Sequence, residues 1–149
     1  MDLHIILPIV MGIIIGLIEA YFVYEDEGNA GLSGFFGKVW HGMMFAIVGC
    51  VIVTNIPFLF GPEGMLSGIG SWLFIDEATG MSWVLSLVVS IFMFVKIDMA
   101  HRIRGISGSG FVEKPWHKAA VALLVGFSGY YILPMYNIEV IAALAIPFI

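Results

Sequence analysis

Four long, continuous apolar segments constrain the fold of this chain more than any other feature. They cover Leu3–Val23, Trp40–Phe60, Met81–Met99 and Trp116–Tyr136. A helix rises 1.5 Å per residue, so about 20 apolar residues cross the roughly 30 Å hydrocarbon core of a bilayer. The strands of a membrane barrel would instead alternate apolar and polar positions over about ten residues. The segments therefore predict four transmembrane helices.

The composition agrees with a protein that lies mostly within a membrane. Hydrophobic residues make up 60% of the 149 residues and charged residues only 11%, whereas soluble domains contain about 25% charged residues. These values exclude a soluble globular enzyme. The net charge of −5 with six Lys and Arg leaves no basic surface for nucleic acid. We expect one all-α integral membrane domain over residues 1–149, with the single Cys50 unable to form an intrachain disulfide.

Two further apolar stretches are too short to span a bilayer. Met65–Ile75 and Ile138–Ile149 contain 11 and 12 residues, about 18 Å as helices. Each is interpreted as an interfacial helix or a re-entrant segment. The second has a third alternative, a continuation of the last span beyond Pro134.

The distribution of basic residues predicts the orientation. Lys38 precedes the second span, and the other basic residues surround the loop between the third and fourth spans: Lys96, Arg102, Arg104, Lys114 and Lys118. By the positive-inside rule the loops at residues 24–38 and 100–115 are cytoplasmic, and both termini lie outside the cytoplasm. Trp40 and Trp116 would then mark the inner boundary of a plasma membrane, and Trp72 and Trp83 the outer one. The acidic N-terminus lacks the basic start of a secretory signal, so the first segment is expected to remain as a span.

An internal match indicates a duplicated unit. Residues 34–46 and 110–122 share six identities in thirteen positions at an offset of 76, including Lys, Trp and His in the same register. We interpret residues 1–75 and 76–149 as two copies of a two-span unit. Two spans per copy give both copies one orientation, which predicts a parallel repeat.

The copies differ most in their cytoplasmic loops. Glu25, Asp26 and Glu27 of the first align with His101, Arg102 and Ile103 of the second. One alternative is that the two halves, or two subunits, meet through these opposite charges. The other is that both loops are solvated, where exposed ion pairs contribute about 0–1 kcal/mol. A Gly-x-x-x-Gly pair, Gly12 and Gly16, indicates close helix packing within the chain or against a partner.

The matched histidines, His41 and His117, are candidate cofactor ligands. In a pseudo-symmetric bundle they could ligate a haem or a metal between helices. The favoured alternative is that each Lys-x-Trp-His motif anchors a helix at the membrane surface. No haem or metal is therefore predicted, and either is kept only as an alternative.

Charged residues near the cytoplasmic ends of the spans form the other candidate sites. Asp98 and His101 share a helix face and could form a nitrogen and oxygen metal site with Glu19 or His41. A polar cluster at the helix end is the favoured interpretation, because two fixed ligands do not define a metal site. Glu19 also lies at nearly the same depth as Lys96. Because charges at this depth are usually paired or functional, we predict either a Glu19–Lys96 ion pair or an ion pathway that uses this carboxylate.

Glu63 and Glu139 extend the possible ion pathway to the outer side. Each follows a span end that contains a proline and precedes a short apolar stretch. They could attract cations, or they could only stabilise the first turn of a short helix, by about 0.3–1 kcal/mol.

Three functions are compatible with these features, and no catalytic residue is predicted. The favoured one is a non-catalytic structural or accessory subunit of a membrane complex, or a homo-oligomer. A membrane oxidoreductase such as a copper monooxygenase is one such complex, although no residue singles it out. The second is a small-solute or ion transporter or channel built from the repeat. The third is a haem- or metal-binding electron carrier that uses His41 and His117.

Overall fold

The computed structural model describes residues 3–27, 32–61, 63–76, 80–105 and 114–136. Within these ranges the chain is helical, and its only extended pairing is an isolated bridge between Ile75 and Ser82. Ile138–Ile149 and Glu139 lie outside the described residues. The expectation of an all-α protein is confirmed for the described chain.

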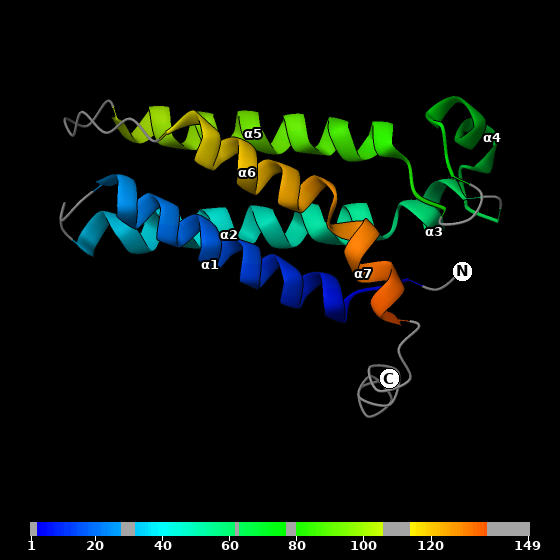
Figure 1. Ribbon diagram of the computed structural model, residues 1–149, viewed down its shortest axis with the longest axis horizontal. Helices are drawn as coiled ribbons and strands as arrows, with labels where there is room; N and C mark the ends of the chain where they lie inside the picture. The colour runs from blue at the N-terminus through cyan, green and yellow to red at the C-terminus, as the bar shows by residue number, and fades with distance from the viewer. Residues whose placement is uncertain (1–2, 28–31, 62, 77–79, 106–113, 137–149) are drawn as a thin grey trace.

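Two antiparallel helical hairpins form the body of the molecule (Figure 1). The first consists of α1 (Ile6–Glu27) and α2 (Leu32–Thr54). The second consists of α5 (Trp83–Gly105), which returns through α6 (Pro115–Gly126) and α7 (Ser128–Tyr136). The short helices α3 (Ile56–Phe60), α4 (Ser67–Gly70) and η1 (Ser71–Leu73) connect the hairpins.

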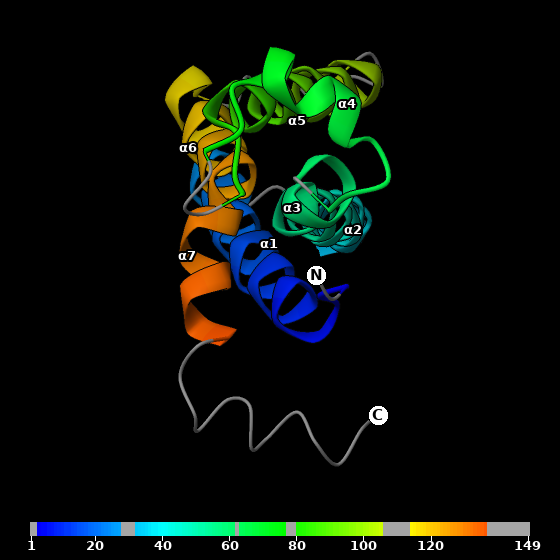
Figure 2. The same ribbon diagram turned by 90° about the vertical axis from the view of Figure 1, so that its right-hand side faces the viewer.

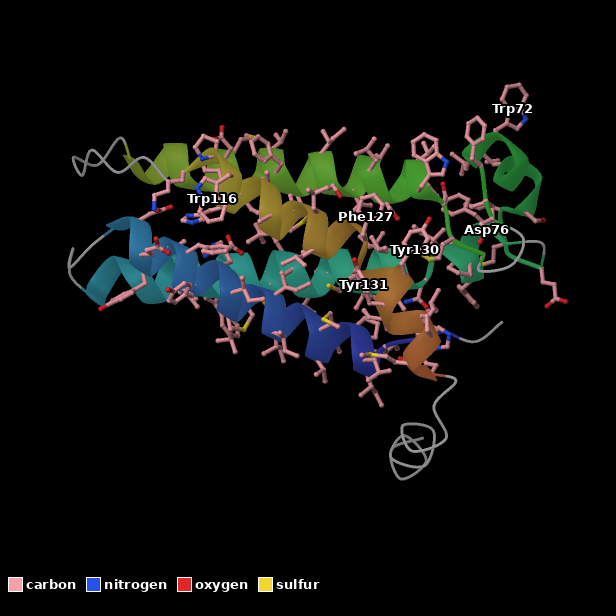
Figure 3. The ribbon with its side chains drawn as sticks, in the orientation of Figure 1. Trp72, Asp76, Trp116, Phe127, Tyr130 and Tyr131 are labelled. Carbon is pink, nitrogen blue, oxygen red and sulfur yellow. The ribbon has the colours of Figure 1, made fainter. Side chains whose placement is uncertain are left out.

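The two ends of this bundle differ in character. The helices α1 and α5 finish, and α2 and α6 begin, at the same end, which we call the charged end (Figure 1). The short helices and the end of α7 lie at the opposite end. Figure 3 shows Trp116 at the charged end and Trp72 at the opposite end, both largely exposed. The loops expected over 24–38 and 100–115 are shorter than predicted. Helix α1 continues to Glu27, α2 begins at Leu32 and α5 continues to Gly105.

Glycines bring α1 and α2 into close contact. A Cβ added at Gly16 would lie 2.7 Å from the Cα of Met43, and one at Gly12 would collide with the backbone of Ile47. Real Cβ atoms do not occupy such positions, so only glycine permits this separation of the helices. The Gly-x-x-x-Gly pair therefore packs within the chain, which was one of the two alternatives that the sequence left open.

The predicted second span, Trp40–Phe60, is interrupted at Asn55. Its continuation would be blocked by Pro57, which lacks an amide hydrogen and clashes with the preceding turn. The Asn55 side chain satisfies the backbone at the break, because its Nδ2 donates to the carbonyl of Val51 at 2.8 Å and to that of His4 at 2.7 Å. Its Oδ1 also accepts the His4 amide at 2.8 Å, which ties the start of the chain to the end of α2.

The predicted fourth span, Trp116–Tyr136, is also broken, at Phe127 between α6 and α7. Gly126 packs against Ser86 and Ser90 of α5, so a side chain there would collide with α5. The Ser128 hydroxyl donates to the Val125 carbonyl at 2.7 Å and satisfies part of the freed backbone. Beyond the break α7 swings away from α5 toward α1 (Figure 2).

The apolar stretch Met65–Ile75 forms two short helices beside the start of α5. The Ser82 hydroxyl donates to the Leu73 carbonyl, and the Asp76 amide donates to the Met81 carbonyl at 2.8 Å. Phe74 adopts a left-handed conformation with φ of 50°, which is uncommon for a residue other than glycine. Trp72 points outward from this segment (Figure 3).

Two helices of the described chain are long and apolar enough to cross a membrane. They are Ile6–Asp26 and Pro115–Tyr136, the second counted across the break at Phe127.

Between the hairpins lies a core of fully buried side chains that includes Cys50, Ala46, Val121 and Val125. The repeat over residues 1–75 and 76–149 stays a prediction.

Candidate functional site

A carboxylate from the first hairpin and a histidine from the second meet inside the charged end. Asp26 Oδ2 lies 2.6 Å from His117 Nδ1. The Asp26 side chain is 1% exposed and that of His117 is 0% exposed, so the pair is shielded from solvent. When His117 is neutral, a proton on Nδ1 donated to Asp26 leaves its lone pair on Nε2. That Nε2 is buried and has no hydrogen-bond partner among the described residues.

Lys114 completes this contact between the hairpins. Its backbone amide donates to Asp26 Oδ2 at 3.0 Å, and its Nζ lies 3.2 Å from Asp26 Oδ1 and 3.3 Å from Glu25 Oε1. Hydrogen bonding to Asp26, and secondly to Glu25, raises the pKa of the Lys114 ammonium above its ordinary value. We call Glu25, Asp26, Lys114 and His117 the α1–α6 ionic cluster.

The position of Asp26 explains why α6 begins where it does. Pro115 occupies the first turn of α6, and the capping residue Lys114 makes no side-chain capping bond. Asp26 supplies the missing acceptor from another helix, and its negative charge interacts favourably with the N-terminal end of the α6 dipole. The same charge lies at the C-terminal end of α1, where the dipole disfavours it. Docking of α6 therefore offsets an unfavourable local feature of α1.

Aromatic rings enclose the histidine. The Phe22 ring stacks on the His117 ring with centroids 4.1 Å apart and an interplanar angle of 7°. The centroid of the Trp116 ring lies 3.8 Å from that of the His117 ring and 5.6 Å from that of the Phe22 ring. Phe22 and Asp26 are four residues apart and therefore lie on the same face of α1. This face supplies both the ring that stacks on His117 and the carboxylate that hydrogen-bonds to it.

A second ion pair joins α5 to α6 next to the cluster. Lys118 Nζ donates to Asp98 Oδ1 at 2.8 Å. The structure therefore brings Asp98 to a lysine of α6. His101 belongs to α5, but its side chain lies outside the described residues.

Glu19 and Lys96, the two charges predicted to lie at nearly the same depth, contact different residues. The Glu19 carboxylate is 3% exposed and fills the space over Gly42 of α2, where a Cβ would collide with it. The Lys96 ammonium lies over the rings of Phe45 and Phe92, 6.0 and 5.6 Å from their centroids. Among the described residues, the structure shows no ion pair between Glu19 and Lys96.

The two matched histidines have different environments. His117 is fully buried against α1, whereas His41 lies on the exposed surface of α2. The structure does not bring them into contact with each other. Among the residues that it describes, no group of three or more His, Cys, Asp and Glu side chains could hold a metal ion. Glu63 is exposed in the turn before α4.

Away from the charged end, a shallow apolar hollow lies on the outer face of the α6–α7 break. It has a volume of about 410 Å³ and is lined by Ala120, Leu123, Leu124, Phe127 and Tyr131. Figure 3 shows Phe127 at the break and Tyr131 beyond it in α7. None of these side chains is a carboxylate, histidine or cysteine, and the phenol of Tyr131 is the one polar side-chain group among the five.

The sequence did not single out Asp26 as the partner of His117. The repeat aligns Asp26 with Arg102, so the alignment compares it with a residue of the other loop rather than with the histidine it contacts. One available signal was the run of three acids at the end of a predicted span, where the helix dipole disfavours them. Glu25 and Asp26 contact the second hairpin through Lys114. The side chains of His101 and Arg102, the opposite charges that the sequence suggested, lie outside the described residues.

Comparison of the chain with protein-family models, with curated proteins and with solved structures finds no match.

Proposed function

We propose that the chain is a four-span membrane protein that acts as a non-catalytic packing subunit, in a homo-oligomer or in a larger membrane complex. The observation that carries this proposal is the use of charge at the charged end. Asp26 joins α1 to Lys114 and His117 of α6, and Asp98 joins α5 to Lys118. These ionisable groups hold helices together, which is the role expected of a structural bundle.

Close packing along the helices supports the same role. Gly12 and Gly16 fit α1 onto α2, and Gly126 fits α6 onto α5. Small residues at helix interfaces increase the packing attraction that drives association of helices in lipid. The result is a rigid body whose outer surface is largely apolar and available to lipid or to other subunits.

The four-span topology is supported by helix lengths as well as by hydropathy. Both α2 and α5 contain 23 residues, about 34 Å of helix. The helix ends joined by the loops at residues 24–38 and 100–115 lie together at the charged end (Figure 1). We therefore propose that the charged end is cytoplasmic and that both termini are outside the cytoplasm.

The decisive experiment is purification of the tagged full-length chain from its native membrane in a mild detergent. Native gels and mass spectrometry then identify what migrates with it. We expect either one stoichiometric assembly with other membrane subunits or a homo-oligomer. A monomer that conducts ions or solutes when reconstituted alone would overturn the proposal.

A transporter is the second candidate, and the buried Glu19 carboxylate in α1 favours it. Charged groups within spans often mark ion or proton pathways. Flux into vesicles containing the wild-type chain, lost in Glu19→Gln with oligomeric state unchanged, would support this alternative. An absorption spectrum of the same preparation tests the haem alternative. We expect no Soret band, and a band lost in both His41→Ala and His117→Ala would support an electron carrier.

A further inference from the structure

The ammonium group of Lys96 lies on the flank of the bundle between α2 and α5. Phe45 of α2 and Phe92 of α5 are within 6.0 and 5.6 Å of it, measured to the ring centroids. Lys96 is half-buried. We call the surface around Phe45, Phe92 and Lys96 the α2–α5 seam.

Among the described residues, the contacts of the Lys96 ammonium are these two rings, and no carboxylate neutralises it. The nearest acid along α5, Asp98, is bonded to Lys118 at 2.8 Å. A cation at membrane depth is costly. Ring contacts close to the 6 Å limit offset only part of that cost. The seam therefore presents a positive charge that favours an anion from outside the chain.

The depth of Lys96 suits the headgroup layer. Phe45 is five residues from Trp40, about 7.5 Å along α2, and Trp40 is 62% exposed, as expected for a tryptophan at the membrane surface. The long lysine side chain can extend over such a distance toward the phosphates. His41 is also exposed and lies one turn before Phe45, on the same face of α2.

Ion pairs join α6 to its two neighbours, through Lys114 and Asp26 of α1 and through Lys118 and Asp98 of α5. In sequence, the two helices that form the seam also carry basic residues in their terminal turns: Lys38 in α2, and Arg102 and Arg104 in α5. Basic sites between spans on the cytoplasmic side are where anionic lipid headgroups bind.

Apolar side chains continue the seam toward the membrane centre. On α5, Phe92 is 56% exposed and lies one turn from Lys96. On α2, Val48 and Ile52 are 49% and 48% exposed and follow Phe45 at helical spacing. A lipid acyl chain can pack along these side chains while its phosphate meets the ammonium.

We propose that the α2–α5 seam binds the phosphate of an anionic phospholipid, with Lys96 as its charge partner. This inference rests on the proposed membrane topology. It adds a specific lipid ligand to the proposed packing subunit.

Native mass spectrometry of the full-length chain tests the inference. The chain in detergent is equilibrated with equal amounts of phosphatidylglycerol and phosphatidylcholine, and the ratio of the two retained lipids is measured. We expect wild type and Lys96→Arg to retain phosphatidylglycerol preferentially. Lys96→Met should lower the ratio about fivefold, the effect of one basic residue near an anionic membrane surface. Lys114→Gln removes a charge at the same end, from the α1–α6 ionic cluster, and should leave the ratio unchanged.

Three results would overturn the lipid site. The first is an unchanged lipid ratio in Lys96→Met, and the second is an equal fall of that ratio in Lys114→Gln. In the third, the concentration of inorganic phosphate that displaces phosphatidylglycerol is the same for wild type and for Lys96→Met. The last would assign retention to non-specific anion exchange. Resistance to alkaline extraction from membranes is measured first for each variant. A wild-type chain that is released by alkaline extraction would overturn the four-span proposal. This result is distinct from a change in the lipid ratio, which concerns only the lipid site.

Discussion

Asp26 and His117 are 91 residues apart in sequence, yet their side chains lie 2.6 Å apart within the charged end. One comes from the last turns of α1 and the other from the first turn of α6. Both are shielded from solvent. This contact fixes how the two hairpins meet, and the first prediction follows from it.

Replacing Asp26 with Asn should destabilise the bundle by about 3–5 kcal/mol. The variant removes the negative charge of Asp26 and leaves its partners, Lys114 and His117, without the carboxylate that they contact. Glu25→Gln is the matched control. Its side chain is 44% exposed, so the loss should not exceed about 1 kcal/mol. The measurement is the unfolding midpoint in mixed detergent micelles, monitored by helical circular dichroism. An equal loss of stability in the two variants would show that the buried Asp26–His117 contact contributes no more to stability than an exposed ion pair.

Alanine at Gly16 should separate α1 from α2, because its Cβ would lie 2.7 Å from the Cα of Met43. Overpacking of this kind typically costs about 1–3 kcal/mol. Gly68→Ala is the control, since its added Cβ would meet no atom within 4 Å. Thermal unfolding in detergent should show a lower midpoint for Gly16→Ala only. A midpoint equal to that of Gly68→Ala would mean that the helices are not packed this closely in the membrane.

Accessibility of single cysteines should report the orientation. In a Cys50→Ser background, cysteines are introduced at Gly31, Ser107 and Ala78, and intact cells are treated with an impermeant thiol reagent. We expect labelling only at Ala78, because all the basic residues lie on the side of the other two positions. Labelling at Ser107 from outside would reverse the proposed topology.

Neutralising the outer carboxylates separates the packing role from transport. Glu63→Gln and Glu139→Gln, alone and together, should leave assembly unchanged. Glu63 is exposed in a turn, where a charge interaction contributes about 0–1 kcal/mol, and Glu139 is expected to contribute as little. Native gels and vesicle flux assays measure the two properties. A cation flux present in wild type and absent in a correctly assembled double variant would favour transport.

The helical nature of the long segments could be predicted because uninterrupted apolar runs of about 20 residues are typical of helices and lack the alternation of half-buried strands. Their interruptions were harder to predict. The break at Asn55 depends on a proline two residues later and on an asparagine that bonds back to His4. The break at Phe127 depends on how Gly126 meets the serines of α5, which is a property of the docked hairpins.

The candidate site was predicted less well, for a related reason. His41 and His117 share one local motif, so local sequence assigns them one role. They differ because α1 places its acidic end against His117, while His41 lies on the exposed surface of α2. Which histidine is enclosed depends on the order in which the helices pack. That order cannot be derived from a motif of eight residues.

The acidic end of α1 also bears on how the protein is made. In the proposed topology, the first hairpin is synthesised before α6, so Asp26 reaches the membrane surface before Lys114 and His117 are available to contact it. Until then its charge opposes the dipole of its own helix and favours the water layer. The hairpin therefore inserts with an end that remains hydrated, and arrival of α6 converts that end into an interior. Final closure of the bundle is thus a step that only the completed chain can take.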